Sequence, residues 1–198
     1  MISAIAKTDL TAIVLIDVLY DYIDGTISCE GAEPAARRAA AFINNNPKLK
    51  AYYVVDTHPS NHCSFKEYGG VWPVNCVAAT RGVTIHAAFY SLSNFDNRPQ
   101  ADNVYRKGVD ADDDRYSAIA AETAFGGELF RTLPKKVIVC GNATEYGVKA
   151  TCDDLLETGH EVTILEDALG YITKEGHDEA VAAMREQGVR FINAVRYD

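Results

Sequence analysis

The sequence predicts an α/β protein of three layers, αβα, in which helices cover both faces of a central parallel sheet of five or six strands. Short apolar runs, many of them β-branched, alternate with helical stretches, and the apolar period changes between the two. The runs are apolar almost without interruption, which is typical of strands buried on both faces of a parallel sheet. Right-handed crossovers then place helices on both sides of the sheet.

The elements follow one another without a repeat, a linker or a low-complexity segment, so we expect residues 1–198 to form a single domain. The expected strands cover residues 11–16, 51–55, 104–105, 136–140, 161–165 and 189–192. The expected helices cover residues 32–43, 118–133 with a break at a pair of glycines, 144–157 and 176–187. A long irregular stretch at 57–80 is rich in proline, glycine and histidine.

The composition favours a protein of the cytoplasm. The chain has 198 residues and a net charge of −9, which argues against nucleic-acid partners and against an anionic membrane surface. No apolar run approaches the ~18 residues of a membrane-spanning helix, and the first residues lack the pattern of a signal peptide. The five cysteines are widely and irregularly spaced, which indicates free thiols in a reducing compartment.

Polar side chains stand at the carboxyl ends of four expected strands. They are Asp17 after the first strand, Asp56 and His58 after the second, Lys107 after the third, and the turn 141–144 after the fourth. Parallel sheets bind ligands at this edge, because the carboxyl ends of all strands meet there. A carboxylate, a carboxylate–imidazole pair, an ammonium and a helix N-terminus at one edge predict a site for a small molecule.

Five segments around these residues resemble the isochorismatase-like hydrolase superfamily in their order and spacing. They read IDVLYDY at 16–22, DTHPSNHCSFKEYGGVWPVNC at 56–76, RKG at 106–108, YSAI at 116–119 and VIVCGNATEYGVKAT at 137–151. The second segment is most similar to the nicotinamidase-like branch. The resemblance extends from the first strand to about residue 167 and implies the isochorismatase-like hydrolase fold.

Nicotinamidase-like members hydrolyse small amides through an Asp–Lys–Cys triad. By this resemblance, Asp17 is the aspartate, Lys107 is the lysine, and the Asn142–Ala143 bond is a cis peptide in a turn that stabilises an oxyanion. Gly147 occupies the position of the nucleophile and has no side chain with which to attack a carbonyl group. The chain is therefore a hydrolase by resemblance in which the usual nucleophile is missing.

The resemblance also implies a divalent, zinc-like metal near the site, held by one aspartate and two histidines. Its ligands in this sequence would be Asp56 and His58, with Glu67 as a further acidic residue and Asn75 in place of the second histidine. An amide is a weaker ligand for such ions than an imidazole is, so we expect the metal to be weakly bound or absent.

The ligand is expected to be a small molecule, and no organic cofactor is expected. Trp72 and Tyr146 would line its pocket by resemblance. His62 is expected to form hydrogen bonds inside its own loop, and the acidic run at 110–114 is expected to be a solvated surface. We also expect a homo-oligomer.

The missing nucleophile leaves three interpretations open. In the first, the chain descends from amide hydrolases and is inactive as an amidase; in the second, it is a non-catalytic homologue that binds a small molecule or a partner. In the third, it is a vinyl-ether hydrolase of the isochorismatase type, in which Asp17 protonates the substrate and no covalent intermediate forms. A replacement thiol is disfavoured, because Cys152 follows Gly147 by more than a helical turn and Cys140 ends a buried strand.

Overall fold

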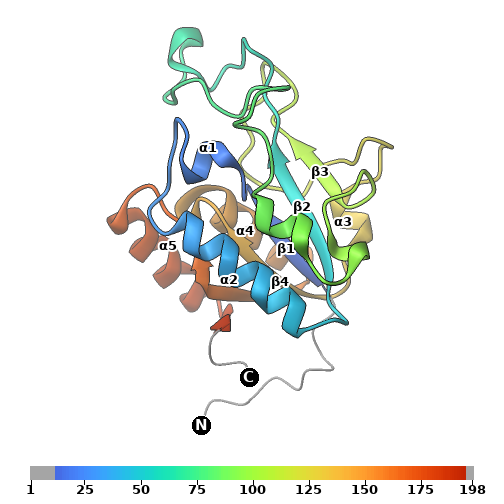
Figure 1. The fold of residues 1–198 in the computed structure, drawn as a ribbon. Coiled ribbons are helices and arrows are strands. Elements are labelled where there is room, and N and C mark those ends of the chain that lie inside the picture. Colours follow the sequence, from blue (N-terminus) through green and yellow to red (C-terminus); the bar gives the residue numbers. More distant parts are fainter. Residues whose placement is uncertain (1–11, 195–198) are drawn as a thin grey trace.

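The computed structural model describes residues 12–194 and contains a six-stranded parallel sheet (Figure 1). The strands lie in the order β3-β2-β1-β4-β5-β6, and each is parallel to its neighbours. Their bounds are β1 Ala12–Ile16, β2 Lys50–Asp56, β3 Val104–Lys107, β4 Lys136–Gly141, β5 Glu161–Leu169 and β6 Arg190–Ile192. This confirms the expected α/β fold with a parallel sheet, in its six-stranded form.

The first strand lies in the middle of the sheet, between β2 and β4. All five of its residues are buried, which explains its uninterrupted apolar run. The register places Ile16 between Val54 of β2 and Gly141 of β4. The next residue, Asp17, therefore leaves the sheet at the centre of its carboxyl edge.

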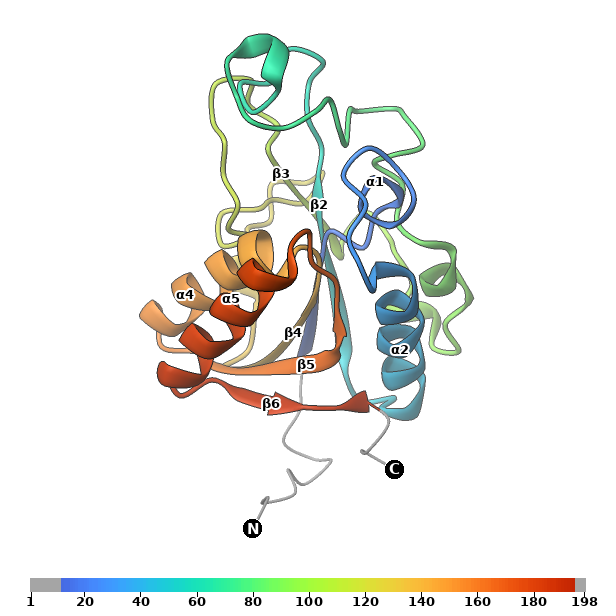
Figure 2. The same cartoon turned by 90° about the vertical axis from the view of Figure 1, so that its left-hand side faces the viewer.

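Helices cover both faces of the sheet. Figure 2 shows α2 on one side and α4 with α5 on the other. Their bounds are α2 Ala32–Asn45, α4 Lys149–Glu157 and α5 Lys174–Glu186. Side chains alternate along β1, so that Ile13 and Leu15 pack in the core formed with α2. Ala12, Val14 and Ile16 pack in the core formed with α4 and α5.

The helix expected over residues 118–133 is wrong for most of its length, because only α3, Leu129–Thr132, is helical there. The preceding residues run along the outer edge of β3, where Glu122 exchanges two backbone hydrogen bonds with Arg106, at 2.8 and 3.2 Å. An edge strand exposes N–H and C=O groups that need partners, and this pairing outweighs the local helical pattern. Gly126, with a φ of +76°, turns the chain back toward α3.

The other expected elements are confirmed in place and differ in extent. β5 continues to Leu169, with a register shift against β4 between Val139 and Gly141. The helix expected from residue 144 begins with a π-helical turn, Thr144–Val148, ahead of α4. Short helical segments that were not predicted are α1 Tyr20–Ile23, η1 Lys66–Tyr68, η2 Ala87–Ser91 and η3 Phe95–Asn97. Residue 11 of the first expected strand lies outside the described residues.

The helices are short compared with the thickness of a bilayer. Within residues 12–194, none combines the length and the apolarity that are needed to cross a membrane.

Candidate active site

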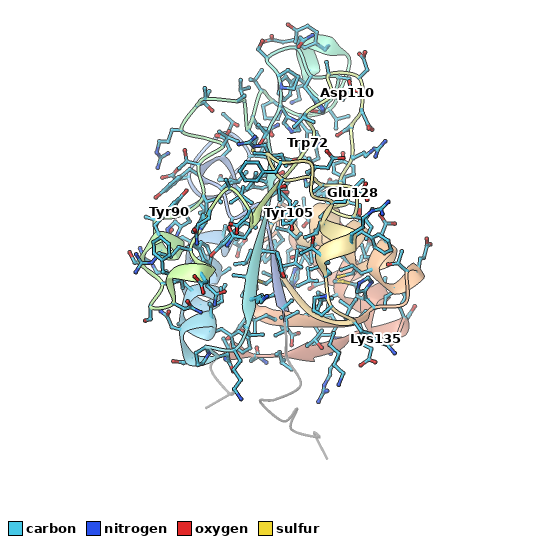
Figure 3. All side chains as sticks on the ribbon, turned by 90° about the vertical axis from the view of Figure 1, so that its right-hand side faces the viewer. Trp72, Tyr90, Tyr105, Asp110, Glu128 and Lys135 are labelled. Carbon is cyan, nitrogen blue, oxygen red and sulfur yellow. The ribbon has the colours of Figure 1, made fainter. Side chains whose placement is uncertain are left out.

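A cavity, partly open to solvent, lies at the carboxyl edge of the sheet. Most of the residues expected at the site line it: Asp17, Asp56, His58, Trp72, Asn75, Lys107, Ala143, Tyr146 and Gly147. Glu67 does not line the cavity and is exposed on η1. Figure 3 shows Trp72 just beyond the end of the sheet, below the loop that carries Asp110. The loops after β2 and β3 rise above this edge in Figure 1.

The Asp17 carboxylate is held in place by the backbone around it. Its residue adopts a left-handed conformation, with φ of 46°, which aspartate tolerates better than most side chains. Its N–H donates to the Val54 carbonyl at 2.9 Å, and its carbonyl accepts from Asn142 Nδ2 at 3.0 Å. Its Oδ1 accepts from the Asp56 N–H at 2.7 Å, so only Oδ2 is left for other partners.

Lys107 places an ammonium between two carboxylates. The register of β2 and β3 sets Lys107 beside Asp56, and its Nζ lies 2.5 Å from Asp56 Oδ1 and 2.9 Å from Asp17 Oδ2. The Lys107 side chain is only 4% exposed, so all three charges are buried. The contact of Lys107 with Asp17 Oδ2 is a buried ion pair, in which the ammonium is the charged neighbour of that oxygen.

The surroundings separate the two carboxyl groups in acidity. Burial raises the pKa of Asp17 to about 7, an effect that the Asp56 carboxylate reinforces and Lys107 opposes. Burial also acts to raise the pKa of Asp56, but Lys107 and His58 outweigh it, and the pKa is lowered. Burial acts to lower the pKa of Lys107, yet the two carboxylates raise it overall. Carboxyl groups whose pKa values are pushed apart are suited to acid–base roles, with Asp17 as the one that holds a proton near neutral pH.

The turn after β4 brings Gly147 to the cavity. The Asn142–Ala143 peptide bond is cis, as the resemblance implies. The π-helical turn Thr144–Val148 follows, and the Gly147 carbonyl accepts from the Thr151 hydroxyl at 2.6 Å. Such π-helical turns are rare in helices and occur often at functional sites.

Gly147 has close neighbours around the point where the side chain of a nucleophile would begin. A Cβ at this position would lie 3.5 Å from Asp17 Oδ2, which is an ordinary contact. It would also lie 3.1 Å from Ile16 Cγ2, so that side chain would have to shift slightly. The position therefore lies beside Asp17 Oδ2.

None of the five cysteines, all of which lie in the described part of the chain, lines the cavity. Cys152 and Cys76 are completely buried. Burial raises the pKa of the Cys152 thiol to about 12 and that of Cys76 well above its ordinary value. A thiol that is buried and has a raised pKa is a poor nucleophile. The burial of these cysteines therefore favours the interpretation that no other cysteine replaces the missing nucleophile.

The residues expected to hold a metal do not fit one. Within residues 12–194, no three His, Cys, Asp or Glu side chains are grouped so as to hold an ion. Both oxygens of Asp56 have protein donors, since Lys107 bonds Oδ1 and the Tyr22 hydroxyl donates to Oδ2 at 2.8 Å. The Asn75 amide donates to the Pro73 carbonyl at 2.9 Å. We therefore derive no step of the chemistry through a metal.

The two histidines of the loop after β2 stack on each other, with ring centroids 4.1 Å apart. His62 is fully buried, and its Nδ1 forms a hydrogen bond with Ser64 Oγ at 2.7 Å, which confirms that it bonds inside its own loop. His58 lines the cavity, and burial lowers the pKa of its imidazole. His58 is therefore a neutral ring at the cavity wall near neutral pH.

Three aromatic rings form one wall of the cavity. Trp72 and Tyr146 meet edge to face, with centroids 5.0 Å apart, and Tyr116 lies 5.4 Å from Tyr146. The Trp72 indole nitrogen donates to the Tyr116 hydroxyl at 3.1 Å, which fixes the two rings relative to each other. A fixed apolar wall of this kind suits the face of a flat ligand.

Tyr22 and Tyr116 line the cavity and were not assigned to the site from the sequence. Both lie in segments that carry the family resemblance, which was the available signal, but their partners are distant in the chain. Asp114, expected in a solvated loop, is exposed and also lines the cavity. Asn142 lies just behind the cavity wall, where it holds the Asp17 backbone.

These features define a class of αβα proteins in which the carboxyl edge of a parallel sheet holds a buried acid–ammonium pair beside a helix-opening turn. A family model described as the Isochorismatase domain matches residues 11–195, and the chain belongs to this family. The resemblance seen in the sequence is thereby confirmed.

Relatives place the similarity in the nicotinamidase-like branch. The chain is 28% identical to the nicotinamidase of Escherichia coli (strain K12) over 149 residues, which are 65% of this chain and 67% of that protein. It is 24% identical to the nicotinamidase/pyrazinamidase of Mycobacterium tuberculosis (strain ATCC 25618 / H37Rv) over 194 residues, 92% and 98% of the two chains.

Solved structures show the same similarity. PnC1 from L. infantum in complex with nicotinate has a TM-score of 0.81 and 25% identity, with 98% of each chain covered. The pyrazinamidase of Pyrococcus horikoshii in complex with zinc has a TM-score of 0.77 and 28% identity, with 92% of this chain and 98% of that one covered.

Proposed function

We propose that this chain is a small-molecule hydrolase of the isochorismatase family that acts through Asp17 without a covalent intermediate, and that its substrates are small enol ethers. The observation that carries the proposal is the geometry of Asp17. Its Oδ2 lies 2.9 Å from Lys107 Nζ and 3.5 Å from where a side chain at Gly147 would begin. An acid beside a position that carries no nucleophile can protonate a substrate without forming a covalent intermediate.

The reaction would begin with proton transfer from the Asp17 carboxyl group to the alkene carbon of the enol ether. Water then adds to the resulting oxocarbenium carbon and loses a proton, which restores the acid. The hemiketal collapses to a ketone and an alcohol, so that the net change is the addition of one water. The O–H bond of Asp17 breaks and is later restored, and no covalent bond between protein and substrate forms at any stage.

Lys107 and Asp56 would support this proton transfer without touching the reacting carbon. When Asp17 gives up its proton, the ammonium of Lys107, 2.9 Å from Oδ2, stabilises the carboxylate that remains. Asp56 keeps Lys107 charged and in place through the shorter contact at 2.5 Å. The N–H of Asp56 fixes the other oxygen of Asp17, so the acid presents Oδ2 to the substrate.

The aromatic wall supports a small flat ligand. Trp72 and Tyr146 offer ring faces and edges, while the charged groups lie deeper, at the strand ends. The related PnC1 was solved with nicotinate, a ligand of the size and shape that this wall suits. A cytoplasmic location and a homo-oligomeric state remain predictions.

The second candidate is a non-catalytic homologue that binds a small molecule in the same cavity. It is favoured by Gly147, which removes the nucleophile that amide hydrolysis requires, and by Asn75 in the expected metal position. Amide hydrolysis through an acyl-enzyme at position 147 is ruled out by chemistry, because glycine has no side chain that can form one.

Turnover of isochorismate as the enol ether and nicotinamide as the amide separates these candidates. Asp17→Asn is the informative variant, since asparagine tolerates the left-handed backbone and keeps the shape but has no proton to give. We expect enol-ether hydrolysis by the wild type, a loss of about 100-fold or more in the variant, and no amide hydrolysis. Binding without any turnover would support the second candidate, and turnover that survives in Asp17→Asn would contradict the first.

A further inference from the structure

We propose that Asp56, His58 and Asn75 form a metal-free corner of the cavity, in which His58 and Asn75 offer hydrogen-bond acceptors to an N–H or O–H donor of the ligand. Below, these three residues are called the acceptor corner. The proposal rests on the small-molecule cavity of the proposed function, and it does not depend on any chemistry at Asp17.

Each carboxylate oxygen of Asp56 already accepts from a donor of the protein, so neither oxygen is free to bind a metal. Lys107 Nζ lies 2.5 Å from Oδ1, and the Tyr22 hydroxyl donates to Oδ2 at 2.8 Å. A divalent cation bound here would also lie beside the buried ammonium of Lys107, which repels it. The Asp56 carboxylate therefore binds groups of the protein itself.

His58 presents a lone pair at its Nε2. Its Nδ1 lies 2.9 Å from the Gly108 carbonyl, which can only accept, so Nδ1 carries the hydrogen. In the neutral ring, Nε2 is then a bare acceptor. Nε2 is 3.9 Å from Asp56 Oδ2, too far for a hydrogen bond. Stacking on His62, with centroids 4.1 Å apart, fixes the plane of the ring.

Asn75 offers an acceptor for the same reason. Its Nδ2 donates to the Pro73 carbonyl at 2.9 Å, and because that carbonyl can only accept, the amide nitrogen has to face it. Oδ1 is left as the acceptor of this side chain, which lines the cavity and is 4% exposed. An imidazole at this position would have offered a ligand to a metal, whereas the amide is tied to its own loop.

The acceptor corner reverses the polarity that a metal would give this part of the cavity. A metal ion accepts the lone pair of a ligand atom such as a pyridine nitrogen. Imidazole and amide lone pairs repel that nitrogen and bind an N–H or O–H in its place. Ligand selection should therefore favour rings with a donor at this position over rings with a bare nitrogen.

Two amides with the same ring skeleton and carboxamide test this preference by calorimetric titration. Nicotinamide has a bare ring nitrogen, and 6-oxo-1,6-dihydropyridine-3-carboxamide has an N–H at the same ring position and a carbonyl oxygen on the adjacent carbon. We expect the oxo compound to bind about tenfold more tightly, because the bare nitrogen leaves the corner unpaired. Titration of Asp17→Asn gives the same preference with any turnover removed.

Substitutions test whether the preference for the oxo compound comes from the acceptor corner. His58→Phe keeps a flat ring beside His62 and removes Nε2, so the two amides should then differ by less than about threefold. Asn75→Leu removes the amide acceptor at similar volume and should weaken the oxo compound alone. His160→Phe makes the same chemical change away from the cavity and should leave the preference intact.

The proposal would be overturned by equal binding of the two amides, by a preference that persists in His58→Phe, or by binding of neither amide. A zinc titration gives an independent reading that needs no organic ligand. We expect no saturable zinc binding at micromolar concentrations, and stoichiometric tight binding would also overturn the proposal. None of these results depends on whether Asp17→Asn loses turnover, so failure of the corner and failure of the proposed reaction are distinguishable.

Discussion

Replacing Lys107 by methionine is expected to destabilise the protein strongly, because it leaves two buried carboxylates without their shared cation. Nζ lies 2.9 Å from Asp17 and 2.5 Å from Asp56. At 2.9 Å and an effective dielectric constant of about 20, one such pair attracts with about 6 kcal/mol, part of which offsets desolvation. Removal of one partner of a buried ion pair costs about 3–5 kcal/mol, and we expect Lys107→Met to fall in this range at pH 8.

The cost should shrink in acid. Without Lys107, burial and mutual repulsion raise the pKa of a carboxyl group in the folded variant. A raised folded-state pKa contributes stability below the unfolded value near 4, and this contribution is lost as the pH rises through the folded value. Urea denaturation of wild type and variant between pH 4 and 8 measures this difference.

Lys149 provides the matched control for Lys107. It pairs with Asp153 one helical turn away, where both side chains are partly exposed. Lys149→Met should cost less than about 0.5 kcal/mol at any pH in this range. The reasoning is refuted if Lys107→Met costs no more than this control, or if its cost does not fall in acid.

Three further experiments test the site. Gly147→Cys should lower the free energy of unfolding by about 1–2 kcal/mol in urea denaturation, because its Cβ crowds Ile16 at 3.1 Å. Full stability would contradict the packing. Partial hydrolysis of small amides should return in this variant if the site descends from an amidase. Thr151→Val should cost about 1–3 kcal/mol by leaving buried backbone groups unpaired, and a cost near zero would show that these bonds are replaced by water. The double variant Asn75→His, Tyr22→Phe should bind zinc about tenfold or more tightly than Asn75→His alone, as measured by calorimetry. Equal affinities would show that the hydrogen bond from the Tyr22 hydroxyl to Asp56 does not weaken zinc binding.

The position of the site was predictable because parallel topology brings strand ends together. Asp17, Asp56 and Lys107 lie far apart in the chain, yet Asp17 directly follows β1 and the other two end β2 and β3, so the parallel sheet brings them together. The strands themselves were predictable from uninterrupted apolar runs, and α2 was predictable from its alanine-rich helical stretch.

The remaining features depend on tertiary contacts that no local pattern encodes. Residues 118–128 have a helix-compatible composition, but Glu122 pairs with the free edge of β3 through Arg106. Tyr22 is 34 positions away from Asp56 in the chain, and its hydroxyl donates to one oxygen of the carboxylate that was expected to bind a metal. The resemblance indicated where Asp56 and His58 stand, but not that Tyr22 and Lys107 donate to Asp56 or that the Gly108 carbonyl accepts from His58.

The pH dependence of enol-ether turnover tests the central claim most directly. Burial raises the pKa of Asp17 to about 7, and the proposed reaction needs its protonated form. With isochorismate as substrate, the wild-type kcat/KM should be level below about pH 7 and fall about tenfold per pH unit above it, and Asp17→Asn should remove this activity. A rate that rises through pH 7, activity that survives in Asp17→Asn, or no turnover above the buffer rate would contradict the account.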